Sequence, residues 1–351
     1  VSGEILDIPW NDRAFSFAMG FEHRRDKSNF IAGGGTELGF SRLAPLQTTR
    51  GNIEISEGFW EGLVPVVTPD MNVPFLESFE IEGAARYIAN DLAGDDRTWT
   101  VGGRFRMTED IMFRGNFTRS VRAPSVGEAF APSQGTRDNL DDPCDLNNID
   151  RGPNADVRRR NCETLFEQFN QEFISETGME IDAQTQNPGL QTGVSNFLST
   201  IRNQSQALTI VGNPDLTNEV ADSYTIGTVL TPRWIPGLSL AMDWVDIELK
   251  NVIFSVDGTT LANTCFDDPN FERFCDSIIR QPNFQIQDAI QSFQNIGFRN
   301  FQALILASNY ESDLSSLGLP DWGSVRIGLN YQYLDQLETS ISGTGADLNL
   351  D

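Results

Sequence analysis

Long segments in which apolar and polar residues alternate recur along the whole chain. In residues 13–26, for example, Phe15, Phe17, Met19 and Phe21 occupy every second position, with small or charged residues between them. Successive side chains of a β-strand point to opposite faces, so a period of two predicts strands with one apolar and one polar face. The pattern therefore favours an all-β fold.

Nine segments show this alternation. They lie at about 13–26, 52–66, 76–88, 99–107, 111–120, 221–232, 237–250, 297–310 and 322–337. Several run for about 10–14 residues, whereas strands of globular proteins average about 5–6 residues. The greater length suits a strand that crosses a lipid bilayer at a tilt. We expect an antiparallel transmembrane β-barrel fragment of about nine strands.

The connections between these strands alternate in length. Short turns are expected at 108–110 and 232–237, and long loops near 26–51, 121–220 and 251–296. If the strands are antiparallel, turns gather at one end of the sheet and loops at the other, as in outer-membrane barrels with long extracellular loops. Tryptophans near strand ends would fit an interfacial aromatic girdle. These are Trp10, Trp99, Trp234, Trp244 and Trp322.

The first long loop contains apolar residues at helical spacing. Leu165, Phe166, Phe169 and Phe173 predict a short amphipathic helix over 158–173. We favour packing of this helix on the loop itself over docking of a partner. A second helix is expected within 190–208.

Acidic residues outnumber basic ones two to one, with 50 Asp and Glu against 25 Lys and Arg. Such a surface repels phosphate backbones, which argues against DNA or RNA as a partner. No apolar run reaches the roughly 18 residues of a transmembrane helix, whereas barrel strands need only short alternating segments.

The chain offers little material for catalysis. His23 is its single histidine, so a Ser-His-Asp triad or a histidine metal site is not expected. No pair of carboxylates stands out for acid–base chemistry. We therefore expect no enzyme activity, no catalytic residue, no bound metal and no cofactor.

Four cysteines form two local pairs in polar loops, Cys144 with Cys162 and Cys265 with Cys275. Neither pair has zinc-site spacing or a nearby histidine. Four cysteines allow three disulfide connectivities, of which we prefer the local one in an oxidising compartment. Four free thiols, typical of a cytosolic protein, are the alternative.

Four arginines fall on the polar, lumen-facing side of three consecutive predicted strands. They are Arg86, Arg104, Arg106 and Arg114. If a loop centred on residue 93 closes a symmetric hairpin, Glu82 lies opposite Arg104 and Glu80 opposite Arg106. The arginines are candidates for binding an anionic ligand. We favour the alternative, a cross-strand ladder of ion pairs that lines a hydrated lumen.

The strand that begins at Ile111 ends at Arg122-Ala123-Pro124. Pro124 has no N–H to donate to a neighbouring strand and restrains Ala123 to extended conformations. We interpret this tripeptide as the end of strand pairing rather than as a ligand contact.

Two blocks resemble the TonB-dependent outer-membrane receptors. Residues 114–130, RGNFTRSVRAPSVGEAF, are similar to the family's barrel strand and loop entry, and residues 212–249 to its late barrel block. Residues 8–26 resemble a mid-barrel strand that follows a Pro-Trp turn. The cysteines beside Asp-Asp-Pro, at 141–144 and 265–269, resemble a proteobacterial subgroup with cysteine-closed outer loops.

The resemblance implies a 22-stranded barrel closed by an N-terminal plug. It also implies a periplasmic TonB-type energy-coupling protein that engages a short box ahead of the plug, and outer-membrane lipid around the barrel. The ligand would be an iron–siderophore, cobalamin or an oligosaccharide, imported at the expense of the proton-motive force.

We expect residues 1–351 to be a partial barrel domain that lacks the plug, the coupling box and the last strands. Val1 begins no signal peptide, so an interior piece of a longer protein is expected. The loop inserts are expected at about 121–220 and 251–296. Two other functions are a passive porin-like channel and a secreted β-rich binding or adhesion protein.

Overall fold

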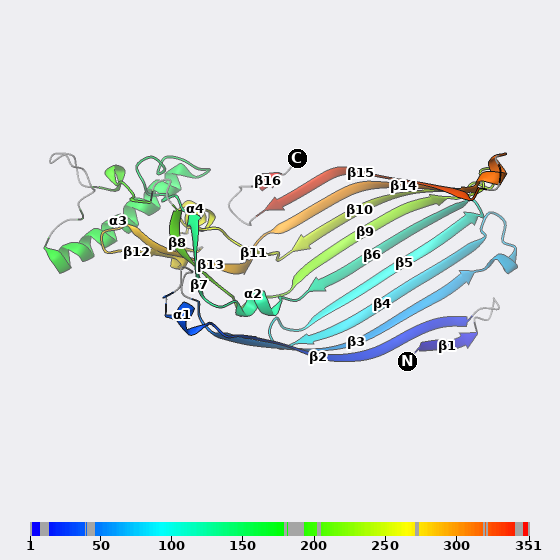
Figure 1. The fold of residues 1–351 in the computed structure, drawn as a ribbon, viewed down its shortest axis with the longest axis horizontal. Helices are drawn as coiled ribbons and strands as arrows, with labels where there is room; N and C mark the ends of the chain where they lie inside the picture. The colour runs from blue at the N-terminus through cyan, green and yellow to red at the C-terminus, as the bar shows by residue number, and fades with distance from the viewer. Residues whose placement is uncertain are drawn as a thin grey trace.

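The computed structural model describes residues 2–7, 14–38, 40, 46–178, 181, 193–201, 205–270, 274–318, 320, 322–340 and 347–349. These residues form one eleven-stranded antiparallel sheet with a compact unit at one end of the strands (Figure 1). The sheet order is β1-β2-β3-β4-β5-β6-β9-β10-β14-β15-β16, so β1 and β16 are its edges and the barrel is not closed in this chain.

The strands of the main sheet follow the alternating segments of the sequence. They are β1 (Ser2–Asp7), β2 (Ala14–Phe30), β3 (Thr49–Val67), β4 (Ser78–Asn90), β5 (Asp96–Thr108), β6 (Ile111–Arg122), β9 (Glu219–Leu230), β10 (Leu238–Lys250), β14 (Phe298–Asp313), β15 (Ser324–Ser340) and β16 (Asp347–Asn349). All nine expected strands are present, and the all-β prediction is confirmed.

The ends of the sheet differ as expected, with one exception. The turns at 109–110 and 231–237 lie at the same end, which we call the turn end, together with the 3-10 helices η1 (Pro69–Met71) and η4 (Leu314–Leu317). Loops 31–48, 123–218 and 251–297 leave the opposite, loop end. The exception is 91–95, a short turn at the loop end.

In the turn at 231–237, Gly237 has a φ of +86° and lies against the backbone of Glu311, which leaves no room for a side chain.

The described parts of the two longest loops fold together into one unit, which we call the loop module (the described residues within 134–211 and 253–295). Its five-stranded sheet contains β7 (Gln134–Asn139), β8 (Ser205–Val211), β11 (Ile253–Ser255), β12 (Ile278–Arg280) and β13 (Ile286–Asn295). Strand β8 of the first loop pairs parallel to β13 of the second. Helices α3 (Ala155–Thr177) and α4 (Gly258–Asp267) pack on each other beside it. Helices α1 (Gly34–Glu37) and α2 (Val126–Phe130) lie outside the module.

The predicted helix over 158–173 is present as α3, and its apolar face packs inside the module. Phe166 is buried, and Leu165, Phe169 and Phe173 are partly buried against the same core. The helix expected within 190–208 is wrong: the described part of that segment holds only the 3-10 helix η2 (Val194–Asn196) and the start of β8. Within this segment, Gln206, Ala207 and Leu208 pair with β7, so their backbone groups join a strand ladder in place of a helix. None of the described helices is long and apolar enough to cross a membrane.

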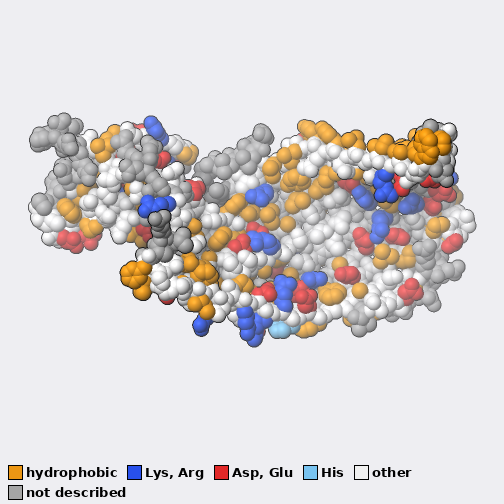
Figure 2. Space-filling model, in the orientation of Figure 1, with side chains coloured by type: hydrophobic (Ala, Val, Ile, Leu, Met, Phe, Trp, Pro, Cys, Tyr) orange, Lys and Arg blue, Asp and Glu red, His pale blue; other side chains and the backbone are white. Residues whose placement is uncertain are grey.

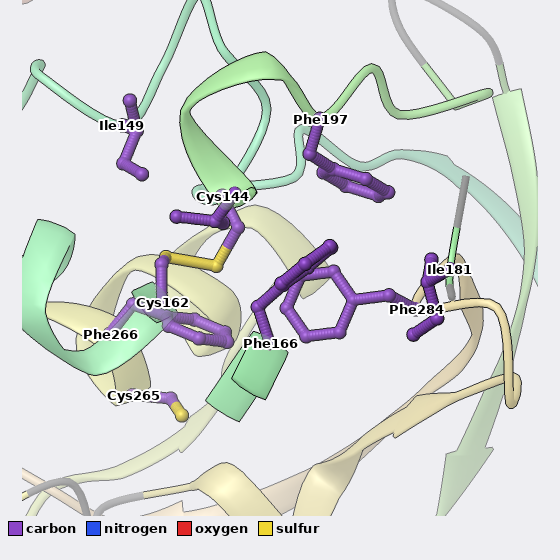
Figure 3. Packing of buried hydrophobic residues seen from close by; sticks show 10 residues of the cluster. Cys144, Ile149, Cys162, Phe166, Ile181, Phe197, Cys265, Phe266 and Phe284 are labelled. Carbon is purple, nitrogen blue, oxygen red and sulfur yellow. A yellow bond between two sulfur atoms is a disulfide. The ribbon is translucent and has the colours of Figure 1, made fainter. Parts of the chain in front are cut away.

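The core of the loop module draws aromatic side chains from both loops (Figure 3). The ring of Phe284 contacts those of Phe166, Phe169 and Phe197 edge to face, at centroid distances of 5.0, 5.6 and 5.1 Å. The Cys144–Cys162 disulfide borders this core, and a second disulfide joins Cys265 to Cys275. These are the local pairs that the sequence analysis preferred.

Two buried ion pairs also connect the loops. The guanidinium of Arg158 on α3 donates to both carboxylate oxygens of Asp267 on α4, at 2.7 and 2.6 Å. Arg280 on β12 donates to both oxygens of Asp142, at 2.8 and 2.7 Å. Each charged side chain is at most 5% exposed. Because an unpaired buried charge is costly, each pair requires that both loops be in place.

Asp267→Ala in the full-length protein is expected to destabilise the loop module by about 3–5 kcal/mol, because Arg158 would remain buried without a partner. Hydrogen exchange of α3 and α4 would measure the loss. Glu163→Ala is the matched control, since its pair with Arg159 is exposed and 3.9 Å long. Equal protection in the two variants would contradict the proposed role of the buried pair.

Candidate functional site

The main sheet has an apolar outer face and a polar inner face. Tyr224, Ile226 and Met242 on the outer face are 50–69% exposed, which is the arrangement of side chains that meet lipid. One outer row runs through Phe105, Phe113 and Thr228 in register. On the inner face, basic and acidic side chains lie next to one another along the strands, and Figure 2 shows such neighbouring groups over the sheet. The inner face is therefore the candidate site.

Arg86 lies on the inner face of β4 and is held by β3. Its Nη1 donates to Glu57 at 2.6 Å, and its guanidinium carbon lies 5.2 Å from the centre of the Phe59 ring. The Glu57 side chain is 8% exposed, so the ion pair compensates a nearly buried carboxylate.

The register of β4 and β5 differs from the predicted one by two residues. Glu80 lies opposite Arg104, and Glu82 opposite Gly102. The predicted loop centre at residue 93 is therefore wrong, because Asn90 closes the turn with its side-chain oxygen on the N–H groups at 92 and 93. Arg104 still reaches Glu82 diagonally, at 3.0 Å, and lies 3.8 Å from Glu80.

Arg106 lies nearest the turn end and does not pair with Glu80 as predicted. Its register partner on β4 is Ser78, and its Nη2 approaches the sulfur of Met112 at 3.7 Å. No ion pair of Arg106 occurs among the residues that the structure describes.

Arg104 and Arg114 lie directly opposite each other on β5 and β6. Like charges in this position repel. Each is drawn away by a carboxylate on its far side, Arg104 by Glu82 and Arg114 by Asp243. Arg114 donates to both oxygens of Asp243, at 2.8 and 2.6 Å.

The pair of Arg114 and Asp243 spans an intervening strand. In register, Arg114 on β6 faces Gly227 on β9, which faces Asp243 on β10. A Cβ at Gly227 would lie 1.9 Å from the Asp243 Oδ1 atom. The glycine is therefore required for the two charged groups to meet above it.

The inner face also has a hollow with little charge compensation. A cavity of about 480 Å³ lies over β2, β3 and β4, where Ser16, Ala18 and Ala84 leave space. Glu61 lines it and forms no ion pair within the described part of the chain.

Three of the four candidate arginines, Arg86, Arg104 and Arg114, are engaged by carboxylates, which supports the ion-pair ladder. Contact of these arginines with a ligand stays a prediction.

Arg122-Ala123-Pro124 marks the end of β6, as expected from Pro124. Arg122 is held at this edge: it donates to Glu128 at 3.0 and 3.1 Å and pairs with Glu219 at the start of β9. Ser125 caps α2 and exchanges hydrogen bonds with Glu128. Glu219 in turn accepts from the N–H of Ile253, at 2.7 Å. The arginine therefore connects the sheet to both long loops.

Burial acts to raise the pKa of the Glu128 carboxyl, but hydrogen bonds from Arg122 and Ser125 outweigh burial and hold that pKa below its ordinary value. The segment lies beyond the strand ends, where water reaches it.

Other predicted features fall in separate places. His23 lies on β2, where its Nδ1 and the Ser56 hydroxyl are 2.9 Å apart. No group of metal-ligating side chains occurs among the described residues.

The tryptophans expected at strand ends lie in different places. Trp234 and Trp322 lie in connections at the turn end, Trp99 lies near the loop end and Trp10 lies outside the described residues. Trp244 lies in the middle of β10, so its placement at a strand end is wrong.

The sequence pattern named Glu82, which does pair with Arg104, but it did not indicate the acidic partners of Arg86 and Arg114. Glu57 and Asp243 lie on the correct faces of predicted strands, so the alternation pattern could have indicated their side. Their partners depend on strand neighbours far apart in sequence, and only the pairing of β6 with β9 and of β9 with β10 brings Asp243 to Arg114.

A family model described as TonB dependent receptor-like, beta-barrel matches residues 10–350. No curated protein matches the chain. A mutant ferric enterobactin receptor of Pseudomonas aeruginosa in complex with enterobactin has a TM-score of 0.50 and 11% identity, with 89% of this chain and 34% of that chain covered. The siderophore receptor PirA of Acinetobacter baumannii has a TM-score of 0.50 and 13% identity, with 97% and 36% covered. The chain therefore spans about a third of the length of either structure.

Gly227→Ala is expected to lower stability by about 1–3 kcal/mol, because the new methyl group displaces the Asp243 carboxylate from Arg114. The temperature at which the folded full-length protein unfolds in SDS would report the change. Gly115→Ala on β6 is the matched control, since its Cβ would meet only a backbone oxygen at 3.8 Å. In an Asp243→Ala background the cost of Gly227→Ala should fall but not vanish, because the Cβ would still lie 2.9 Å from the Met242 carbonyl oxygen. A cost that does not fall there would refute the clash with the carboxylate.

Glu128→Gln is expected to remove a stabilising contribution that depends on pH. Because the folded pKa of Glu128 is lowered, this contribution is present above the ordinary value of 4.5 and is lost as the pH falls through the lowered value. The difference in thermal stability between the native protein and the variant should therefore shrink over that range. A difference between the native protein and Glu128→Gln that stays constant over this range would rule out the linkage.

Proposed function

The chain belongs to the TonB-dependent receptor-like β-barrel family, and from this premise we propose that it forms part of the wall of an outer-membrane receptor for energised ligand uptake. The family consists of bacterial outer-membrane transporters and receptors rather than enzymes. In the proposed protein, a plug and a coupling segment beyond the matched strands engage a periplasmic TonB-type protein. Residues 1–351 then all belong to its barrel domain, and the chain itself has no catalytic role.

The observation that carries the proposal is the division of the sheet into an apolar outer face and an inner face of paired charges. A lipid-facing band explains why Tyr224, Ile226 and Met242 are exposed. Ion pairs such as Arg114–Asp243 and Arg86–Glu57 keep a wide interior polar without presenting unpaired charge. Such a wall suits a lumen that holds a plug and water.

The charge of the outer loops bears on the ligand. Residues 123–218 and 251–297 together contain 20 acidic and 8 basic side chains, a net charge of −12. A negative surface at the entrance repels polyanions. Their local concentration is therefore low in comparison with that of neutral or cationic solutes. Among the three ligand classes considered, an uncharged oligosaccharide or a cobalamin is therefore favoured over an anionic ferric siderophore.

Deletion of the full-length gene is expected to impair growth on maltodextrin oligosaccharides as the sole carbon source, and to leave growth on ferric enterobactin as the iron source unchanged. Removal of the TonB-type protein should reproduce the carbon phenotype, because uptake depends on energy coupling. Growth rates and uptake of labelled maltodextrin would be measured side by side.

Complementation with the full-length gene is the control. A growth defect confined to ferric enterobactin would contradict the ligand preference and leave energised transport in place. Uptake that persists without the TonB-type protein, together with a steady ion conductance of the purified protein in planar bilayers, would support a passive channel instead.

A further inference from the structure

A cavity of about 270 Å³ lies inside the loop module, away from the inner wall of the sheet. Phe169 on α3, Phe266 on α4 and Ile278 on β12 line it, and the Cys265–Cys275 disulfide forms part of its wall. Pockets for drug-sized ligands span about 300–1,000 Å³. The cavity is therefore suited to a single substituted ring.

Arg280 lines the same cavity and is an unusual side chain to find there. It is 2% exposed, and its two terminal nitrogens donate to Asp142 and to the carbonyl oxygen of Phe284. The guanidinium carbon lies 4.2 Å from the centre of the Phe284 ring and 5.2 Å from that of Phe266. Its Nε is buried without a hydrogen-bond partner. Because Nε is enclosed by protein atoms, a ligand in the cavity does not reach it, and Arg280 serves to hold Asp142 and the two aromatic rings in place.

The charges around the cavity disfavour an anion. Asp142 compensates the charge of Arg280 through two hydrogen bonds, and Asp276, exposed at the cavity edge, adds a carboxylate. A carboxylate or phosphate ligand would therefore meet repulsion from Asp276 and little attraction from Arg280. A hydroxyl group suits the edge of the cavity, because it can donate to Asp276.

We propose that this cavity is a binding site for an uncharged hydroxylated ring on the outer side of the receptor. The aromatic side chains of Phe169 and Phe266 supply apolar contact for the faces of the ring, and Asp276 orients a hydroxyl group at the cavity edge. The proposal deepens the transport function and rests on it, because a ring captured in the loop module would be held before it reaches the lumen. A pyranose and a phenol share this chemistry.

The test measures binding to the full-length receptor in detergent micelles by saturation-transfer NMR, with methyl α-D-glucopyranoside in one arm and phenol in the other. We expect saturable binding in at least one arm, which then identifies the source of the ring. Phe169→Ala should weaken that binding about tenfold, because it removes one apolar wall. Asp276→Ala should weaken it as well, since the acceptor for a ring hydroxyl is lost.

Phe173→Ala is the matched control, because Phe173 is also a partly buried phenylalanine of α3 but does not line the cavity. Binding should be unchanged in this variant. An absence of saturable binding in both arms, or an equal loss in the Phe169 and Phe173 variants, would overturn the site. The binding measurement does not depend on uptake. Import of maltodextrin without binding of either probe would reject only the binding site. Binding of a probe without import would reject only the transport function.

Discussion

The antiparallel hydrogen-bond ladder of the main sheet is the constraint on which the other features depend. A strand inside a bilayer has no water to satisfy its backbone N–H and C=O groups, so neighbouring strands must do so. Once strands of 12–19 residues from β2 to β15 are joined in this way, the period of two places every second side chain toward lipid. The apolar outer face and the polar inner face then follow from the ladder, and so does the placement of every charged group on the wall.

The inner wall shows how this ladder limits the choice of residues. Register places Arg104 directly against Arg114, an arrangement that is unfavourable unless each has a counter-charge. The counter-charges come from opposite sides, and Arg114 reaches its own only because Gly227 has no side chain. The same arginines that a sequence suggests as ligand contacts are therefore already part of a structural network. A ligand that used them would have to compete with carboxylates 2.6–3.0 Å away.

The loop module has a different source of stability. It lies beyond the strand ends, so it relies on a core of its own, which Phe166, Phe197 and Phe284 form together with two disulfides and two buried ion pairs. Because Arg158 and Asp267 come from different loops, as do Asp142 and Arg280, neither loop can hold this structure alone. Arg122, at the end of β6, connects the sheet to the segment that leads into the module, because it pairs with Glu128 on α2 and with Glu219 at the start of β9. A binding surface made from both loops would accordingly exist only when both loops are in place.

Local sequence patterns were enough to predict the all-β fold class, the positions of nine strands, the helix α3 and the end of β6 at Pro124, because each of these depends on residues close together in the chain. The sequence also indicated the family through residues 114–130 and 212–249. The register of β4 with β5, the strand β8 in place of a helix and the union of the two long loops were decided by tertiary structure. The reason is that a side chain such as Asp243 or Asp267 acquires its partner, 129 or 109 residues away, only after strands and loops have met.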